Sequence, residues 1–571
     1  MAGRRSIGLS LLCGLMAVGA VALGLSLRLR DPLSSPVMAA EDPFTHMALV
    51  RNDLDRGSFA PLNAGEGLYP PGLHAMVAVA ASFLGTDLYT LMVLAPAVLG
   101  AIGVAGVAVL LWRHEGPVAA VAGAAACAVA PEIIFRSGMM SPTAIDLALL
   151  PWFLLALLEV VRGRFGWLLP ATTLAVFTLF AHPWLLTVLA ITGVAFAVFV
   201  ATAPWPQGRA PLSSRGLAAA CCIVGVPVAL MLWGCAGTCG AGFRDIFPGG
   251  DQLRFAAPAV AAITLAVAAV LWLAARRLDP LLAARRPRPT WVRLIACVGL
   301  AAALVAIVVP AVQDGMPEFV NLPRMIGWPI LILAGAALVA LPFAATPVRT
   351  AGAALAAATL PFVLYNPFHS PFWPHRTAVY LAVAAAILAG AAVGQASKAA
   401  GAAVQHWLRR PRRASRLAVA PLALAAVVLV GVAGTADVVA ATPDPYAWYR
   451  LYKPCEFAAL QDIATRLATD RRTIAVTGDW QAKLVLAALA PNASRIWFSP
   501  SFFTSPAQRD GLVATMRHAG TPLVAVDDPL LKMGTPKADM HGFAPPAWMV
   551  LGTWCPAPSR PASVTLYGMT Q

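Results

Sequence analysis

Long runs of apolar residues, separated by short polar segments, dominate the chain up to about residue 440. A run of about 17–25 apolar residues is long enough to cross a hydrocarbon core roughly 30 Å thick. By this criterion the chain has about thirteen spans before residue 440. Only 12% of its 571 residues are charged, about half of the roughly 25% found in soluble domains. The sequence therefore predicts an α-helical polytopic membrane protein and excludes a soluble, disordered or collagen-like chain.

The distribution of charge predicts how the spans are oriented. One set of connections holds 20 basic residues and only three acidic ones, which are Glu115, Glu159 and Asp279. The opposite set, up to Asp437, holds nine basic and fourteen acidic residues. The positive-inside rule places the first set in the cytoplasm, so the N-terminus lies inside and the C-terminal segment outside. This alternation requires that the apolar piece 72–83, at about 12 residues, is a juxtamembrane or re-entrant helix.

The net charge of +15 follows from this topology. Its basic residues stand in short clusters between apolar runs, which is typical of membrane orientation and not of a phosphate-binding face. We therefore expect membrane lipids as partners and no nucleic acid.

The last 130 residues, 442–571, have a different pattern and predict a small extracytoplasmic α/β domain after a membrane domain of residues 1–441. The expected helices lie near residues 456–469 and 481–489, and the expected strands at 473–477, 522–526 and 563–567. Cys455 and Cys555 in this domain, and Cys235 and Cys239 in one outer loop, are candidate disulfide pairs because an extracytoplasmic compartment permits oxidation.

The first outer loop, residues 29–71, is the longest and most acidic connection, and long loops are usually functional. Glu41 and Asp42 precede Pro43, and His46 follows four residues after Asp42. If a short helix continues from this point, Asp42 and His46 share one of its faces. A carboxylate at the membrane boundary has its pKa raised by desolvation, which suits a general base. The alternative is a solvated loop in which Asp42 caps a helix.

Two further segments are candidates for the same outer face. The turn YPPGLH is stiffened by two prolines and holds Tyr69 and His74 at the outer leaflet, although a plain juxtamembrane turn explains it as well. Asp146 and Arg376 are ionisable residues at span ends, which indicates function because an unpaired charge in hydrocarbon costs several kcal/mol. For Arg376 and Arg324 the alternative is interfacial snorkelling. Arginine suits a phosphate because its planar fork binds it bidentately.

These segments resemble the GT-C superfamily of polyprenyl-phosphate-dependent glycosyltransferases. EDPFTH, followed by Arg51, is similar to the Asp-Pro-aromatic-x-His stretch of oligosaccharyltransferase catalytic subunits. YPPGLH, PEIIFRSGMMSPTAIDLALLPW and PFWPHR are similar to an uncharacterised actinobacterial family of multi-span membrane proteins. The WWDYG motif of oligosaccharyltransferases is not matched, since the comparable point reads VTGDW at residues 476–480. This departure favours the transfer of one sugar or a short glycan.

The resemblance implies an inverting transferase that moves a sugar from a polyprenyl-phosphate-linked donor to a cell-envelope glycan, lipid or protein. It implies Asp42 as the catalytic base, with Glu41 as its substitute, and Arg376 and Arg324 as ligands of the donor phosphate. His46, Tyr69, His74 and His375 are the expected substrate-binding residues, and Asp42, His46 and Asp146 are the candidate ligands of a divalent cation, Mg²⁺ or Mn²⁺.

Three alternatives stay open. One is the en bloc transfer of a glycan, as oligosaccharyltransferases perform it. Another is a non-catalytic membrane scaffold in envelope assembly whose GT-C site has decayed. The third is secondary transport, which is typical of repeated halves with ionisable residues near the bilayer midplane. The polar residues of this chain gather instead at one face.

Overall fold

The computed structural model describes twenty-one stretches of the chain, which together hold most of its residues. They are residues 2–34, 37–38, 42–56, 71–202, 212–238, 250–283, 290–292, 294–295, 298–299, 302, 325–364, 373–408, 454–470, 472–478, 480–490, 495–499, 502–503, 505–519, 521–527, 548–554 and 564–569.

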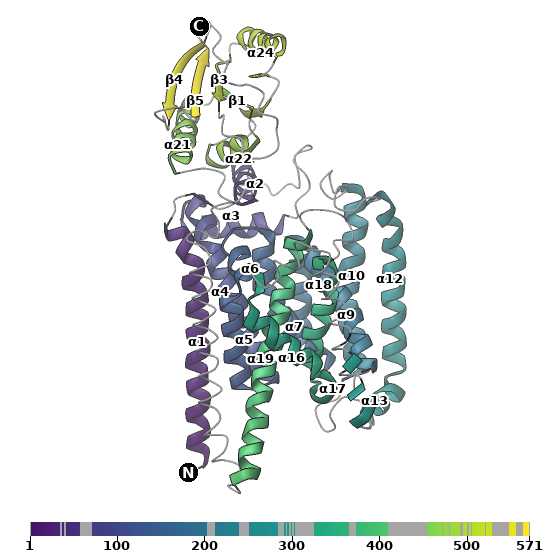
Figure 1. Ribbon diagram of the computed structural model, residues 1–571. Helices are drawn as coiled ribbons and strands as arrows, with labels where there is room; N and C mark the ends of the chain where they lie inside the picture. The colour runs from purple at the N-terminus through teal and green to yellow at the C-terminus, as the bar shows by residue number, and fades with distance from the viewer. Residues whose placement is uncertain are drawn as a thin grey trace.

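A bundle of apolar helices carries a small α/β domain at one end, which we call the upper end, while the N-terminus lies at the opposite, lower end (Figure 1). The helices before the domain are α1 (Ala2–Ser34), α2 (Asp42–Arg56), α3 (Gly72–Leu84), α4 (Leu88–His114), α5 (Pro117–Val129), α6 (Pro131–Arg136), α7 (Pro142–Val161), the 3-10 helix η1 (Phe165–Trp167), α8 (Leu168–Ala181), α9 (Trp184–Thr202), α10 (Ser214–Thr238), α12 (Gly250–Leu273), α13 (Ala275–Ala283), α16 (Trp328–Val339), α17 (Leu341–Ala344), α18 (Pro347–Leu364) and α19 (Trp373–Leu408).

Seven helices in the described part of the chain are long and apolar enough to cross a membrane, which confirms the expected polytopic helical class. They lie within α1, α4, α7, α10, α12, α18 and α19. Five shorter apolar helices accompany them. One of these is α3, whose 13 residues extend only about 20 Å. It lies at the upper end beneath α2, as the expectation of a non-spanning piece at 72–83 requires (Figure 1). The total of about thirteen spans stays a prediction.

Helix α19 forms the centre of the bundle. In its apolar segment 89% of the residues are buried, against 11% in that of α12 at the edge. Glycines let α5 approach α19 closely: a Cβ at Gly390 would meet the carbonyl oxygen of Ala119 at 2.7 Å, and one at Gly394 would meet the Ala119 Cβ at 2.7 Å. This G-x-x-x-G spacing is typical of helices that pack backbone to backbone within a membrane.

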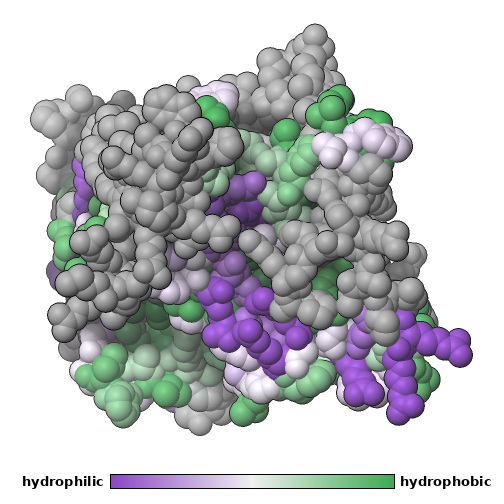
Figure 2. Space-filling view, turned by 90° about the horizontal axis from the view of Figure 1, so that it is seen from below, coloured by the Kyte–Doolittle hydropathy of each residue, from purple (hydrophilic) through white to green (hydrophobic). Residues whose placement is uncertain are grey.

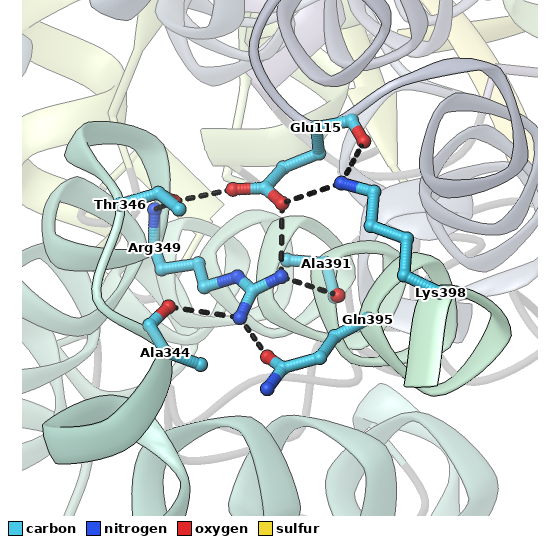
Figure 3. Close-up of polar contacts among 7 residues, drawn as sticks. All are labelled: Glu115, Ala344, Thr346, Arg349, Ala391, Gln395 and Lys398. Carbon is cyan, nitrogen blue, oxygen red and sulfur yellow. Dashed lines mark hydrogen bonds and ion pairs between the residues drawn. The ribbon is translucent and has the colours of Figure 1, made fainter. Parts of the chain in front are cut away.

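A buried carboxylate ties three helices together at the lower end (Figure 3). Glu115 follows α4 and accepts hydrogen bonds from Thr346 Oγ1 and, at 2.9 Å, from Arg349 Nη2 of α18. Lys398 of α19 donates to the Glu115 carbonyl oxygen at 2.6 Å. Arg349 also donates to Gln395 and to the carbonyl oxygens of neighbouring residues.

The C-terminal domain, by which we mean residues 454–569, contains a five-stranded sheet of order β2-β1-β3-β5-β4. Strand β1 pairs in parallel with β2 and β3, whereas β5 is antiparallel to β3 and β4. The elements are α21 (Pro454–Thr469), β1 (Ile474–Thr477), α22 (Trp480–Leu489), β2 (Ile496–Phe498), α24 (Pro506–His518), β3 (Leu523–Asp527), β4 (Trp548–Trp554) and β5 (Val564–Met569). Both expected helices and all three expected strands are confirmed, while β2, β4 and α24 were not predicted.

The expected domain boundary at 441/442 lies outside the described residues. Cys455 is disulfide-bonded. Its expected partner Cys555 and the expected pair member Cys239 lie outside the described residues, and the side chain of Cys235 is not described.

Candidate active site

Helix α2 of the first outer loop lies between the bundle and the C-terminal domain. Its residues Phe44, Met47 and Val50 follow the spacing of one helix face and are fully buried. The Phe44 ring lies 5.9 Å from that of Phe457 on α21, and Arg51 Nε donates to the carbonyl oxygen of Ala488, in the last turn of α22, at 2.8 Å. Residues 42–56 of the loop that sequence analysis singled out are therefore helical and are contacted from above by the C-terminal domain.

Asp42 begins this helix and is partly exposed. Because α2 is regular from Asp42 onward, His46 lies one turn further along the same face, as expected. A carboxylate in the first turn is favoured by the positive end of the helix dipole. Its position thus combines access to solvent with a fixed backbone.

His46 and His74 form a buried pair between α2 and α3. His46 is 2% exposed and His74 is 4% exposed, and His46 Nδ1 lies 3.0 Å from His74 Nε2. One nitrogen must donate and the other accept, so two imidazolium ions are incompatible with this contact. Burial, and secondarily the neighbouring His46, lower the pKa of His74 to about 3. His74 is therefore neutral at physiological pH.

A second polar group lies on α7, at the end of α8 and on α19. Asp146 is fully buried, and its Oδ2 accepts a hydrogen bond from the Tyr380 hydroxyl and lies 2.5 Å from His182 Nδ1. Its Oδ1 is buried without a hydrogen-bond partner among the described residues. A hydrogen bond from His182 to an ionised Asp146 carboxylate uses the Nδ1 proton, because an ionised carboxylate only accepts.

Gly72 brings the two groups to the same level of the molecule. A Cβ at this position would meet the backbone of Phe180 at 2.7 Å and the Ala181 nitrogen at 2.8 Å, so α3 begins directly against the end of α8. His74 follows Gly72 by two residues, and His182 follows Ala181. Glycine is required here by close backbone approach.

Several expected site residues have no described side chain. Glu41, Tyr69 and Arg324 lie outside the described residues, and of His375 and Arg376 only the backbone in the first turn of α19 is described. Position 376 precedes Tyr380 by four residues and so lies on the same face of α19.

Sequence reasoning missed two buried polar residues of the bundle. Tyr380 was hidden within the apolar run of α19. Arg28 of α1 is fully buried and donates to Ser137 Oγ at 2.6 Å and to the Gly24 carbonyl oxygen at 2.7 Å. The signal available for Arg28 was an arginine that directly follows an apolar run and lies within the same predicted helix.

The described residues do not match the donor set of a metal centre. No group of three His, Cys, Asp or Glu side chains is gathered within the part of the chain that the structure describes. Asp146 and His182 contact each other, and so do His46 and His74.

Comparison in sequence is uninformative about activity. The profile of a family of unknown function, DUF6541, matches residues 2–248. No curated protein matches the chain. The resemblance to an actinobacterial family stays a prediction.

Comparison in structure identifies the fold. The oligosaccharyltransferase of Archaeoglobus fulgidus in complex with Zn and sulfate has a TM-score of 0.56 at 14% identity, over 90% of this chain and 68% of that one. ArnT from Cupriavidus metallidurans bound to undecaprenyl phosphate has a TM-score of 0.53 at 14% identity, over 98% of both chains. The archaeal enzyme tethered to an acceptor peptide gives 0.50. The chain thus has the GT-C-like fold that the sequence resemblance implied.

Proposed function

We propose that this protein is an inverting glycosyltransferase that moves a sugar from a polyprenyl-phosphate-linked donor to a cell-envelope acceptor. The observation that carries the proposal is the position of Asp42. It begins a helix that is held between the bundle and the C-terminal domain, in a fold shared with two membrane glycosyltransferases. ArnT bound to undecaprenyl phosphate supports a polyprenyl phosphate as the carrier, and the enzyme tethered to a peptide supports an acceptor at the membrane face.

In the proposed reaction the Asp42 carboxylate removes the proton of an acceptor hydroxyl. The acceptor oxygen then bonds to the anomeric carbon, and the bond from that carbon to the phosphate oxygen breaks, with its electron pair leaving on the polyprenyl phosphate. In-line displacement inverts the anomeric centre. Arg376 and Arg324 hold the departing phosphate, whose developing charge bidentate guanidinium groups stabilise. Glu41 is the substitute base.

The histidines have positioning roles in this proposal. His46 and His74 hold α2 against α3 through a direct contact between their rings, and with Tyr69 and His375 they border the sugar or the acceptor. Asp146 orients His182 and accepts a hydrogen bond from the Tyr380 hydroxyl. Because the described residues gather no metal-ligand trio, we route no step through a metal. The expected Mg²⁺ or Mn²⁺, with Asp42, His46 and Asp146 as candidate ligands, stays a prediction that chelation of the purified enzyme tests.

We place the site on the extracytoplasmic face of a multi-pass cell-membrane protein. The support is the ratio of 20 basic to three acidic residues in the other set of connections. All three of those acidic residues are paired within the fold: Glu115 with Arg349, Glu159 with Arg113, and Asp279 with the Ser214 backbone nitrogen at 2.7 Å.

The test compares polyprenyl-phosphate-linked sugars by lipid mass spectrometry in a deletion strain and in the same strain carrying wild type, Asp42→Asn or Asp55→Asn. Asp55 is an exposed carboxylate near the other end of α2 and serves as the matched control. We expect one lipid-linked sugar to accumulate in the deletion and Asp42→Asn strains only. The mass of that lipid separates transfer of one sugar from en bloc transfer.

Other outcomes are decisive as well. Unchanged lipids in all strains would overturn the transferase proposal and favour transport or a non-catalytic scaffold. Accumulation that Asp42→Asn cures would keep the transferase and move the base to Glu41.

A further inference from the structure

At the lower end of the bundle a single buried carboxylate gathers three arginines. Glu159 of α7 has a fully buried side chain. Arg113 at the end of α4 donates to it through Nε at 2.8 Å and through Nη2 at 3.3 Å. Arg164 donates through Nη1 at 2.6 Å, and Arg162 Nη1 lies 3.7 Å away. We call these four residues and His114 the Glu159 cluster.

His114 adds no positive charge to this cluster. Arg162 Nη1 lies 3.0 Å from His114 Nδ1, and a guanidinium only donates, so Nδ1 must accept. The remaining proton of the neutral ring is then on Nε2, which faces Glu159 Oε1 at 3.4 Å. Three guanidinium groups therefore surround one carboxylate, and the cluster keeps a surplus of two positive charges.

The surplus charge is accessible. The side chains of Arg113 and Arg164 are 39% and 50% exposed. Arg113 uses two of its five N–H groups on Glu159 and rests against the Trp167 ring at 5.2 Å, whereas Arg164 uses one. Both keep donors for a further anion.

An apolar, lipid-facing surface borders the cluster. Trp112 of α4 and Phe165 of η1, which adjoin Arg113 and Arg164 in the sequence, are 37% and 39% exposed, and Leu169 of α8, two residues after Trp167, is 77% exposed. Figure 2 shows the lower end, where hydrophilic side chains gather beside hydrophobic ones. A ligand that binds here has an anionic head and an apolar body, which describes a phospholipid better than a free ion.

We propose that the Glu159 cluster binds the phosphodiester of an anionic phospholipid, of the phosphatidylglycerol class, in the leaflet at the lower end. Arg113 and Arg164 contact the phosphate, while Glu159 holds their guanidinium groups in place. Trp112, Phe165 and Leu169 contact the acyl chains. This site is separate from the candidate active site, which lies at the upper end.

Native mass spectrometry of the full-length protein tests the proposal. The protein is released from nanodiscs of phosphatidylcholine with a minor fraction of phosphatidylglycerol, and the retained lipids are counted. We expect Arg164→Gln to weaken retention of phosphatidylglycerol about fivefold, as for one arginine near an anionic surface. Arg164 is chosen because Arg113 then still pairs with Glu159 and preserves the fold. The control, Arg276→Gln with Arg277→Gln, removes two exposed charges from α13 and should retain the lipid.

Three results would overturn the proposal. The first is equal loss in the cluster variant and the control, which would indicate general electrostatic attraction. The second is no loss in either. The third is displacement of the lipid by millimolar inorganic phosphate or glycerol phosphate, which would make the site one for a free phosphate. A triple variant, Glu159→Gln with Arg113→Gln and Arg164→Gln, leaves no unpaired carboxylate and should lose retention further.

Discussion

The Phe44 ring of α2 lies 5.9 Å from the Phe457 ring of α21, and Phe457 also stacks on Tyr89 of α4 at 5.6 Å. One aromatic side chain of the C-terminal domain thus contacts both the first outer loop and a membrane span. Because Asp42 precedes Phe44 by two residues, the C-terminal domain contacts the helical turn that carries the proposed base.

The contact between Phe44 and Phe457 is testable by a double-mutant cycle. We expect Phe44→Ala and Phe457→Ala each to lower the free energy of unfolding by about 3–5 kcal/mol, because both residues are buried. The two losses should fall short of additivity by about 0.5–1.5 kcal/mol, the size of an aromatic pair. Unfolding with SDS in mixed micelles provides the measurement.

Phe502 supplies the matched control for this cycle. It is a buried phenylalanine of the same domain, but it packs against Phe503 and Trp548 in a different hydrophobic cluster from the one that holds Phe44 and Phe457. Phe502→Ala combined with Phe44→Ala should be additive. Additivity for Phe457 as well would show that α2 and the domain do not share a core.

Buried histidines make stability depend on pH. The pKa of His74 is about 3 in the folded protein and 6.5 when unperturbed, so between these values the unfolded chain binds the extra proton. The contribution of neutral His74 is therefore fully present above pH 6.5 and is lost progressively as the pH falls toward 3. We expect the apparent unfolding temperature in detergent to fall across this window.

The variant His74→Gln isolates this contribution. Glutamine offers His46 a hydrogen-bonding group but does not titrate. The decline in unfolding temperature below pH 6.5 should become shallower than in wild type. An unchanged slope would assign the acid sensitivity to other groups.

Sequence reasoning recovered the elements whose signal is local. The helix from Asp42, the short α3 and three of the five strands all follow from spacing within a few residues. It did not recover pairings that depend on how helices pack. The Asp146 carboxylate and the Tyr380 hydroxyl are 234 residues apart, and so are Glu115 and Arg349. Glu115, Glu159 and Asp279 entered the sequence analysis only as the few acidic residues among basic ones, yet each has a partner in the fold.

Close approach of α3 to α8 makes Gly72 a sensitive position. Gly72→Ala would put a methyl group 2.7 Å from the Phe180 backbone, which cannot move without shifting the end of α8. We expect it to displace His74 relative to His182. The rate at which the variant removes the lipid-linked sugar that accumulates in the deletion strain should fall at least tenfold, which corresponds to a barrier higher by about 1.4 kcal/mol.

Gly335→Ala is the control, because a Cβ on this helical glycine of α16 meets nothing within 4 Å. It should leave activity unchanged and stabilise the helix slightly. If Gly72→Ala restores lipid levels as well as wild type does, the two histidine groups need no fixed relation for function.

The network around Glu115 predicts a large asymmetry between single and paired substitutions. Glu115 and Arg349 are 2% and 5% exposed, so the removal of either partner leaves a charge buried. We expect Glu115→Gln to lower the free energy of unfolding by about 3–5 kcal/mol. Glu115→Gln together with Arg349→Met should cost less than Glu115→Gln alone, since the pair's desolvation penalty disappears with it.

Lys398→Met should have little effect, because the Lys398 side chain is 53% exposed and its charge is screened by water. SDS unfolding of the four proteins separates these cases, and a Lys398 effect as large as that of Glu115 would mean that the network acts through the exposed cation and not through the buried pair.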